Sequence, residues 1–299
     1  MKAPIYACAY TVLAVFQLCN QVGALSSLNA YSDISRRSLI AGTGGLLVSA
    51  FNPDQELSIP IPIPNLQVLE DPDTYSSLLY RPPDSDEKKL PLIVFLHGAG
   101  KNQRDISNLA DIQGEYGGLL PSLIANNKAP KELLDNFIVV SPYAFGTTSF
   151  YDEPRSKMLN FISYAAKHIP QVDPSRIFLF GFSDGATLSV ELLTTQRFAG
   201  GVICSYGYTG ILPDLALQRL AGLPLWVFHS ADDAIFRVQN SDQLVKSLMK
   251  DNGSTKYTRF DKDPEGFTGS VRGHTTGITA SRDPHVYEWL LSIPPAKFS

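Results

Sequence analysis

The sequence predicts an α/β fold with a mostly parallel central sheet and helices on both of its faces. From Phe51 onward, apolar strand-like runs alternate with stretches of helical periodicity, as they do where crossover helices join parallel strands. The run LPLIVFLHG, residues 90–98, is apolar almost throughout, which is typical of a strand buried on both faces. No repeat or low-complexity linker interrupts the pattern, so we expect residues 51–299 to form a single catalytic domain.

The expected strands share a high content of apolar and β-branched residues. In chain order they are YSSLLYRPP (75–83), LPLIVFLHG (90–98), NFIVVSPYA (136–144), VDPSRIFLFGFS (172–183), AGGVICSYG (199–207), LPLWVFHSADD (223–233) and TKYTRF (255–260). We expect the first of them to pair antiparallel with its neighbour. The segment between the fifth and sixth of these runs is too short for a large lid domain.

The expected helices lie between and after these strands. They are GLLPSLIANN (118–127), RSKMLNFISYAAKHI (155–169), DGATLSVELLTT (184–195), QLVKSLMKDNG (243–253) and PHVYEWLLS (284–292). In the second of them, helical spacing places Met158, Leu159, Ile162 and Ala166 on one face.

Residues 1–50 have the layout of targeting sequences. A lysine, an apolar run and small residues predict a secretory signal peptide over residues 1–24. Residues 25–50 are rich in serine and contain a twin arginine, which indicates a transit segment followed by a twin-arginine signal. The apolar run at 39–51 is shorter than the ~20 residues that a membrane span needs, so we expect no stable span in the mature protein. The layout resembles the multipart presequence of a thylakoid-lumen protein in a secondary plastid, with simple secretion as the alternative.

Charge and cysteine content exclude several classes of function. The formal net charge is −4, and residues 1–50 carry three basic side chains and one acidic, so the rest of the chain carries −6. A domain this acidic, without a basic cluster, is not expected to bind nucleic acid. Only Cys204 lies in the body of the chain, which excludes both an intrachain disulfide and a cysteine zinc site there. We expect Cys204 to be a buried strand residue.

The stretch GFSDGA, residues 181–186, places a serine between two glycines in the spacing G-x-S-x-G. It lies between an expected strand and an expected helix, where a nucleophile elbow is found. Gly181 and Gly185 would let strand and helix approach closely while Ser183 adopts a strained, exposed conformation. The N-terminus of the helix would favour negative charge that develops near the serine. Ser183 is therefore the candidate nucleophile.

A serine hydroxyl needs a base, usually a histidine that a carboxylate orients. In this architecture the expected chain order is serine, acid, histidine. That order excludes three of the five histidines, which are His97, His168 and His229. His274 follows the last expected strand in a glycine-bearing loop, at the edge of the sheet where active sites lie, and is the candidate base. His285 opens the last helix, where a polar residue needs no special role.

Two adjacent aspartates are candidates for the orienting acid. Asp232 and Asp233 both follow the strand-like run that begins at Leu223, and both positions suit the role. A turn or a helix cap also explains aspartates at a strand end, and we expect one of the two to serve in that way.

An oxyanion hole requires backbone N–H groups near the nucleophile. Asp184, directly after the serine, would supply one of them. The loop FLHGAGKN would supply another, because Gly98 and Gly100 let its backbone turn toward a substrate, with Ala99 as the expected donor. We expect the ring of His97 to brace this loop rather than to act in catalysis.

These motifs resemble those of the α/β-hydrolase superfamily. Within it they are similar to the phospholipase/carboxylesterase-like esterases, a group that includes predicted secreted peptidases and polyhydroxybutyrate depolymerase-like esterases. The matching segments run from about Tyr75 to Leu291: PLIVFLHGAG, FIVVSPYAF, VDPSRIFLFGFSDGA, LPLWVFHSADD and DPHVYEWLLS. The resemblance implies an α/β-hydrolase fold. It assigns the catalytic residues and the oxyanion donors to Ser183, Asp233, His274, Ala99 and Asp184.

The sequence departs from the pattern of that group in three places. Asp184 stands where a neutral residue is common, Ser230 where glycine is usual, and the loop of residues 261–273 is longer than usual. A carboxylate beside the nucleophile would disfavour anionic acyl groups or raise the pKa of His274. These departures concern the preferred substrate more than the candidate triad.

The expected activity is hydrolysis of carboxylic esters through an acyl-serine intermediate, without cofactor or metal. The absence of a large lid favours an open site that takes small or polymer-attached esters. A peptidase or an acyltransferase with the same triad is an alternative, as is a non-catalytic binding protein of this fold.

Overall fold

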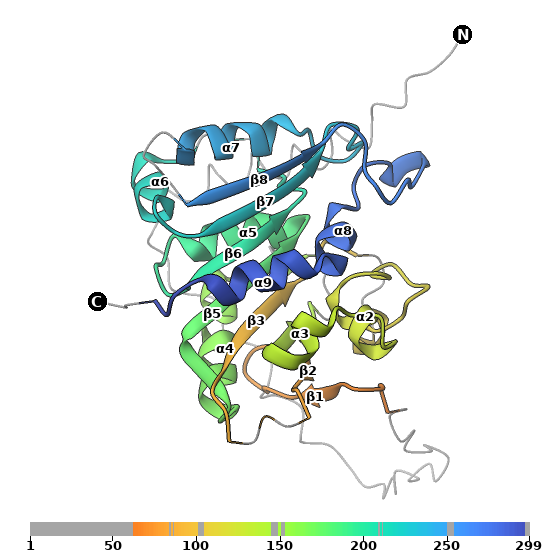
Figure 1. Cartoon of the computed structure of the whole chain (residues 1–299), viewed down its shortest axis with the longest axis vertical. Coiled ribbons are helices and arrows are strands. Elements are labelled where there is room, and N and C mark those ends of the chain that lie inside the picture. Colours follow the sequence, from red (N-terminus) through yellow and green to blue (C-terminus); the bar gives the residue numbers. More distant parts are fainter. Residues whose placement is uncertain are drawn as a thin grey trace, which may run out of the picture. The chain divides into compact units, whose positions relative to one another are not determined.

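The computed structural model (Figure 1) describes most of the chain from residue 62 onward. The described residues are 62–83, 85, 87–100, 105–144, 149–150, 153–208, 210, 212–249 and 254–296. They lie within one compact unit, Ile59–Ser299. The targeting sequences expected in residues 1–50 fall outside the described residues and stay predictions.

One sheet runs through the described part of the chain. Its strands are β1 (Gln67–Leu69), β2 (Ser77–Tyr80), β3 (Leu90–Leu96), β4 (Ile138–Pro142), β5 (Val172–Phe182), β6 (Gly200–Cys204), β7 (Leu225–Ser230) and β8 (Thr255–Phe260). Their order across the sheet is β1-β2-β4-β3-β5-β6-β7-β8. In this order, every pair of adjacent strands from β4 through β3 to β8 is parallel. Strand β2 pairs antiparallel with both β1 and β4. The mostly parallel sheet and its antiparallel first expected strand are confirmed.

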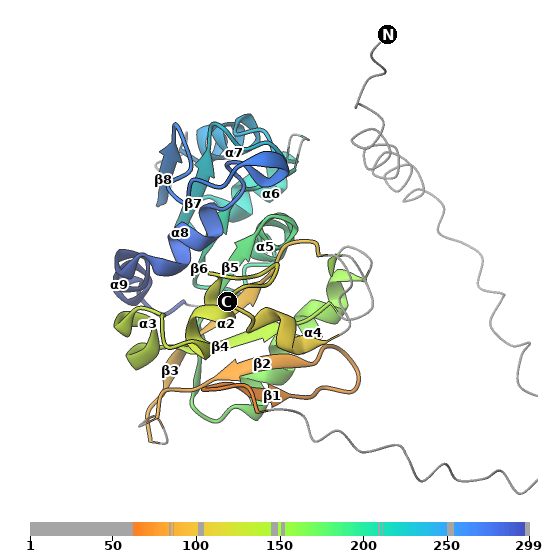
Figure 2. The same cartoon turned by 90° about the vertical axis from the view of Figure 1, so that its right-hand side faces the viewer.

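Helices cover both faces of this sheet (Figure 2). One face packs against α4 (Arg155–His168), α5 (Asp184–Leu193), α6 (Asp214–Leu220) and α7 (Gln239–Met249). The other packs against α2 (Leu120–Ala125), α3 (Lys131–Asn136), α8 (Thr276–Arg282) and α9 (Pro284–Ser292). None of the described helices combines the length and the apolar character needed to span a bilayer.

Several short elements of the structure were not predicted from the sequence. They are β1, α3, α6, α8 and the 3-10 helices η1 (Ile106–Leu109) and η3 (Gly269–Val271). All of them are too short to show a clear hydrophobic period. Between β6 and β7 the described residues form only α6, so no large lid lies there.

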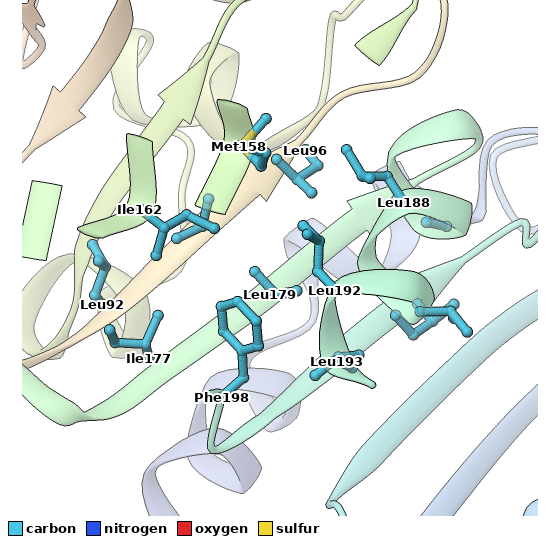
Figure 3. Close-up of a cluster of buried hydrophobic side chains, with 14 of the residues drawn as sticks. Leu92, Leu96, Met158, Ile162, Ile177, Leu179, Leu188, Leu192, Leu193 and Phe198 are labelled. Carbon is cyan, nitrogen blue, oxygen red and sulfur yellow. The ribbon is translucent and has the colours of Figure 1, made fainter. Parts of the chain in front are cut away.

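Strand β3 shows how the core is divided between the two faces. Residues 92–96 of this strand are fully buried and alternate: Leu92, Val94 and Leu96 join one apolar cluster, while Ile93 and Phe95 join the other. This confirms the expectation of a strand buried on both faces. Figure 3 shows side chains of β3 and β5 meeting those of α4 and α5 on the first of these faces.

Helix α4 and strand β6 refine two expectations about buried residues. On α4 the buried residues are Met158, Phe161, Ile162 and Ala165, while Leu159 and Ala166 are only partly buried. The buried stripe is therefore turned slightly from the one expected. Cys204 is fully buried in β6, as predicted.

The carboxyl ends of the parallel strands meet at one edge of the sheet. The residues that follow β3, β5 and β7 therefore lie near one another, although they are far apart in the sequence. Those residues are the candidate oxyanion loop, the candidate nucleophile and the two candidate acids.

Candidate active site

Ser183 occupies the turn between β5 and α5. Its backbone has φ 58° and ψ −122°, a conformation that residues other than glycine rarely adopt, and it is the N-cap of α5. The Ser183 N–H donates to the Cys204 carbonyl at 2.9 Å, which ties the turn to β6. The strained conformation is thus confirmed.

Ser183 was also expected to be exposed, but only 7% of its surface is accessible. The reason lies in the loop that follows β3. A Cβ placed on Gly98 would lie 2.9 Å from the Ser183 Cβ, so the backbone of that loop closes over the serine.

The two glycines of the motif make room for close backbone contacts. A Cβ on Gly181 would clash with Gly185 and Ser189 of the following helix. A Cβ on Gly185 would clash with the Leu96 carbonyl oxygen and lie 2.6 Å from that of His97. Gly181 therefore lets α5 pack onto β5, as expected, and Gly185 lets it pack onto the end of β3.

The side chains of Ser183, His274 and Asp233 form a continuous hydrogen-bonded path. The Ser183 Oγ lies 2.9 Å from His274 Nε2, and His274 Nδ1 lies 2.8 Å from Asp233 Oδ2. With the Nδ1–H tautomer, His274 donates to the carboxylate and accepts the serine O–H. Such an arrangement lets a serine hydroxyl pass its proton to the imidazole.

Both carboxylate oxygens of Asp233 accept hydrogen bonds. Its Oδ1 accepts the N–H groups of Ile235 and Phe236, each at 2.8 Å, and its side chain is fully buried. Burial alone would raise the pKa of Asp233. The hydrogen bonds from His229, His274 and the Phe236 N–H outweigh that effect and lower the pKa to about 2. Asp233 is therefore a carboxylate at neutral pH.

His229 contacts the same carboxylate oxygen of Asp233 as His274 does. Its Nε2 lies 3.1 Å from Asp233 Oδ2 and 3.1 Å from the Phe236 carbonyl, and its Nδ1 lies 2.7 Å from the Ser241 Oγ. Ser241 donates its hydroxyl to Nδ1, so Nε2 carries the proton and donates to the carboxylate. Chain order correctly excludes His229 as the base, but no sequence signal revealed this contact.

Asp232 contacts the loop that carries His274 and does not contact the histidine itself. Its Oδ1 accepts the Ser230 hydroxyl at 2.5 Å and the Asp263 N–H at 3.1 Å. Asp263 in turn accepts the Thr275 N–H at 2.9 Å. The hydrogen bonds thus run from the end of β7 to the residue beside His274. One aspartate of the pair therefore holds a turn, as expected.

Gly273 brings the same loop onto the two aspartates. Its φ is +71°, and a Cβ there would lie 2.5 Å from both the Asp232 carbonyl carbon and the Asp233 nitrogen. The Ala234 N–H donates to the Arg272 carbonyl at 2.8 Å. This close backbone contact requires glycine directly before His274.

His97 braces the loop after β3, as predicted. Its Nδ1 donates to the Gly98 carbonyl at 2.6 Å, and its Nε2 accepts the Ala144 N–H at 3.3 Å. Its ring packs against the rings of Tyr143 and Phe150, with centroids 5.6 and 4.5 Å away. Complete burial lowers the pKa of His97 to about 4, against the opposite effect of the hydrogen bond to Gly98. His97 is thus a neutral structural residue.

The expected oxyanion donors lie on the two segments that meet at Ser183. Ala99 is an exposed residue of the loop after β3, and Asp184 is the first residue of α5. The Asp184 carboxylate is half-buried in the first turn of α5, where a negative charge also stabilises the helix. The donor roles of both residues stay predictions.

His285 lies apart from the hydrogen-bonded path. It is exposed at the start of α9, and its ring bonds to Asp283, the N-cap of that helix. Its place at the start of the last helix is the one expected from the sequence.

Comparisons with known proteins agree with this fold. The family model described as Phospholipase/Carboxylesterase matches residues 151–265, a segment that includes Ser183 and Asp233 and ends before His274. No curated protein sequence matches the chain. Among solved structures, a thermostable esterase is 26% identical, with a TM-score of 0.58 over 76% of this chain. The chain spans 62% of the length of that esterase.

Two further solved structures are similar over nearly their whole length. A putative dienelactone hydrolase from Klebsiella pneumoniae subsp. pneumoniae MGH 78578 is 14% identical, with a TM-score of 0.53 over 76% of this chain and 98% of its own. Thermogutta terrifontis esterase 2 phosphonylated by cyclosarin is 14% identical, with a TM-score of 0.53 over 80% of this chain and 99% of its own. At these identities the likeness shows the fold alone.

Proposed function

We propose that the chain is a serine hydrolase of the α/β-hydrolase superfamily that cleaves carboxylic esters. The observation that carries this proposal is the unbroken path from the Ser183 hydroxyl through His274 to Asp233. The fold alone serves many functions, so the assignment depends on this path.

The contacts of the three residues indicate their roles. His274 Nε2 takes the proton of Ser183 as the serine oxygen attacks the ester carbonyl carbon. Asp233 keeps the proton of His274 on Nδ1 and stabilises the imidazolium that forms. His274 then gives its proton to the departing alcohol, which leaves an acyl group on Ser183. Water, activated by His274, hydrolyses this acyl-serine.

The negative charge of the tetrahedral intermediate needs donors close to Ser183. We assign this role to the backbone N–H groups of Ala99 and Asp184. The support is that the loop after β3 closes over the serine at Gly98, while Asp184 follows the serine directly at the start of α5.

Labelling with a fluorophosphonate tests the nucleophile. The probe suits this fold, because Thermogutta terrifontis esterase 2 is phosphonylated by cyclosarin. We expect the full-length chain to be labelled and Ser183→Ala to remain unlabelled. Ser205→Ala is a matched control, because Ser205 is also a buried serine with a positive φ of 53°, and its hydroxyl bonds to Thr276. Equal labelling of the wild type and Ser183→Ala would contradict the proposal.

A panel of p-nitrophenyl esters and chromogenic peptides then separates an esterase from a peptidase. We expect turnover of esters, and no turnover of peptides at comparable enzyme concentration. Faster turnover of peptides than of esters would favour the peptidase alternative.

The targeting sequences form a separate proposal. We propose that residues 1–50 direct the chain to a plastid and then to the thylakoid lumen, supported by two consecutive signals and a twin arginine in the sequence. A fusion of these residues to a fluorescent protein is expected to enter plastids. Its appearance in the medium instead would establish secretion.

A further inference from the structure

Exposed apolar side chains gather beside the candidate site. Six large apolar side chains are exposed among the described residues, and three of them lie on the two segments next to Asp233 and His274. These three, which we call the apolar rim, are Ile235, Phe267 and Val271, with 48%, 46% and 44% of their surface accessible. The remaining three are on β1, on α6 and at the end of α7.

Backbone hydrogen bonds tie two members of the apolar rim directly to the candidate dyad. The Ile235 N–H donates to Asp233 Oδ1 at 2.8 Å, and the Val271 carbonyl accepts the His274 N–H at 3.0 Å. The Ala234–Arg272 hydrogen bond joins their two segments next to these residues. The backbones of two exposed apolar residues therefore lie directly beside Asp233 and His274.

Phe267 lies further out on the same segment. It comes two residues before η3, and Figure 1 shows that the chain around η3 projects beyond the edge of the sheet. The rim thus extends outward from His274 along one segment.

Three polar residues of this segment make contacts within the protein, whereas Asp261, Lys262, Thr268 and Ser270 are exposed. Asp263 is buried, Glu265 forms an ion pair with Arg282 at 2.7 Å, and Arg272 donates to the Asp232 carbonyl at 3.3 Å. Phe267 and Val271, by contrast, face solvent. Exposed apolar side chains beside a candidate active site offer a surface that an apolar group of a substrate can cover.

Aromatic rings line the inner side of the same site. The Phe236 and Phe182 rings pack against His274, with centroids 5.3 and 5.2 Å away. Apolar side chains are therefore present both next to the His274 ring and on the exposed segment that precedes it.

We propose that the apolar rim binds the hydrophobic group of the ester, so that the enzyme prefers esters with an alkyl or aryl group of several carbons over acetates of small alcohols. This inference rests on the proposed function. A bound hydrocarbon group covers the rim and removes its apolar surface from water, which makes binding favourable.

The test compares long and short esters in wild type and in a Phe267→Ser variant. The readout is the ratio of kcat/KM for p-nitrophenyl octanoate to that for p-nitrophenyl acetate. We expect this ratio to fall about tenfold in Phe267→Ser, because only the longer group reaches the rim. Ile235→Ser and Val271→Ser are expected to lower the same ratio. A parallel series of acetates of ethanol, butanol and octanol shows whether the acyl or the alcohol side binds.

Leu215→Ser and Met249→Ser are matched controls, because they remove exposed apolar side chains elsewhere on the surface. Both are expected to keep the wild-type ratio in both series. The inference would be overturned, and the proposed function left standing, if the enzyme were active but its ratios did not change in any rim variant. The same holds if the ratios changed equally in the controls. Loss of a dimer in the rim variants without a change in either ratio would likewise overturn it and make the rim a contact between copies. If wild type neither reacts with the fluorophosphonate nor hydrolyses any ester, the proposed function fails, and this inference with it.

Discussion

The elbow of residues 181–186 and the histidine loop of residues 261–275 position their side chains by different means. In the elbow, Ser183 is held between a strand and a helix that follow each other directly in the chain, and two glycines allow the tight packing. The histidine loop contains only the short η3, and hydrogen bonds to residues 31 and 41 positions away hold it. The nucleophile thus depends on tight backbone packing, partly against β3 and β6, and the base depends on polar contacts with distant residues.

The largest effect is expected from a change in the packing of the elbow. In Gly185→Ala the new Cβ meets the carbonyl oxygens of Leu96 and His97, which cannot move without distorting β3. We expect the free energy of unfolding to fall by roughly 3–5 kcal/mol, measured by urea denaturation. Gly266→Ala is the matched change in the histidine loop. Its Cβ meets nothing within 4 Å, and only the positive φ of +66° opposes it, so we expect a loss of about 1 kcal/mol. Equal losses in the two variants would erase the contrast between the regions.

A second prediction concerns pH and acts through the contacts of Asp233. Its pKa is about 2 in the folded protein, below the ordinary value of 3.8. A group whose pKa is lowered by folding stabilises the folded protein at pH values above its ordinary pKa. This stabilisation is lost as the pH falls through the pKa of the group in the folded protein. Between pH 5 and pH 2, wild type should therefore lose about 2 kcal/mol more stability than Asp233→Asn. Urea denaturation of both proteins across this range measures the difference, and parallel curves would contradict it.

A third prediction separates the two adjacent aspartates. Asp232→Ala removes the acceptor for Ser230 and for the Asp263 N–H, so the histidine loop loses an anchor. We expect kcat for a p-nitrophenyl ester to fall on the order of tenfold, because small displacements of a catalytic group are costly.

Asp232→Asn is the matched control for this change. Its amide oxygen can replace Oδ1 as the acceptor of both hydrogen bonds, so we expect kcat near that of wild type. Asp233→Asn, one position along, should lose most activity, because the amide no longer holds the Nδ1 proton of His274. If Asp232→Ala and Asp232→Asn were equally impaired, the acceptor atom would not be what positions the loop.

The same contrast explains which parts of the site could be predicted from the sequence. The elbow is a local pattern of strand, glycines and helix, and both Ser183 and the role of Gly181 followed from it. The contact of Gly185 with the end of β3 did not. Chain order left His274 and His285, and the place of His274 in a loop after the last strand made it the candidate base. The residues alone left Asp232 and Asp233 open, whereas the resemblance assigned the role to Asp233, which is the one that contacts His274.

The contacts of His229 and Asp263 could not be predicted, because they depend on which distant segments the fold brings together. Helix α8 was missed for a related reason. Its sequence TGITASR contains glycine and β-branched residues, which are poor helix formers. Its place is set by packing instead, since a Cβ on Gly277 would lie 2.6 Å from the ring of Phe182.

The smallest effect is expected at Ser230, where the esterases that the sequence resembles usually have glycine. Ser230→Ala removes one hydroxyl that donates to Asp232 Oδ1, but the Asp263 N–H still holds the same oxygen. We expect a loss of about 1 kcal/mol in the free energy of unfolding and a change in kcat of about twofold or less. Combining Ser230→Ala with Asp232→Ala should then add little to Asp232→Ala alone, because both act on the same contact. Fully additive losses in urea denaturation would mean that Ser230 stabilises β7 independently, and that the histidine loop is anchored by Asp232 without it.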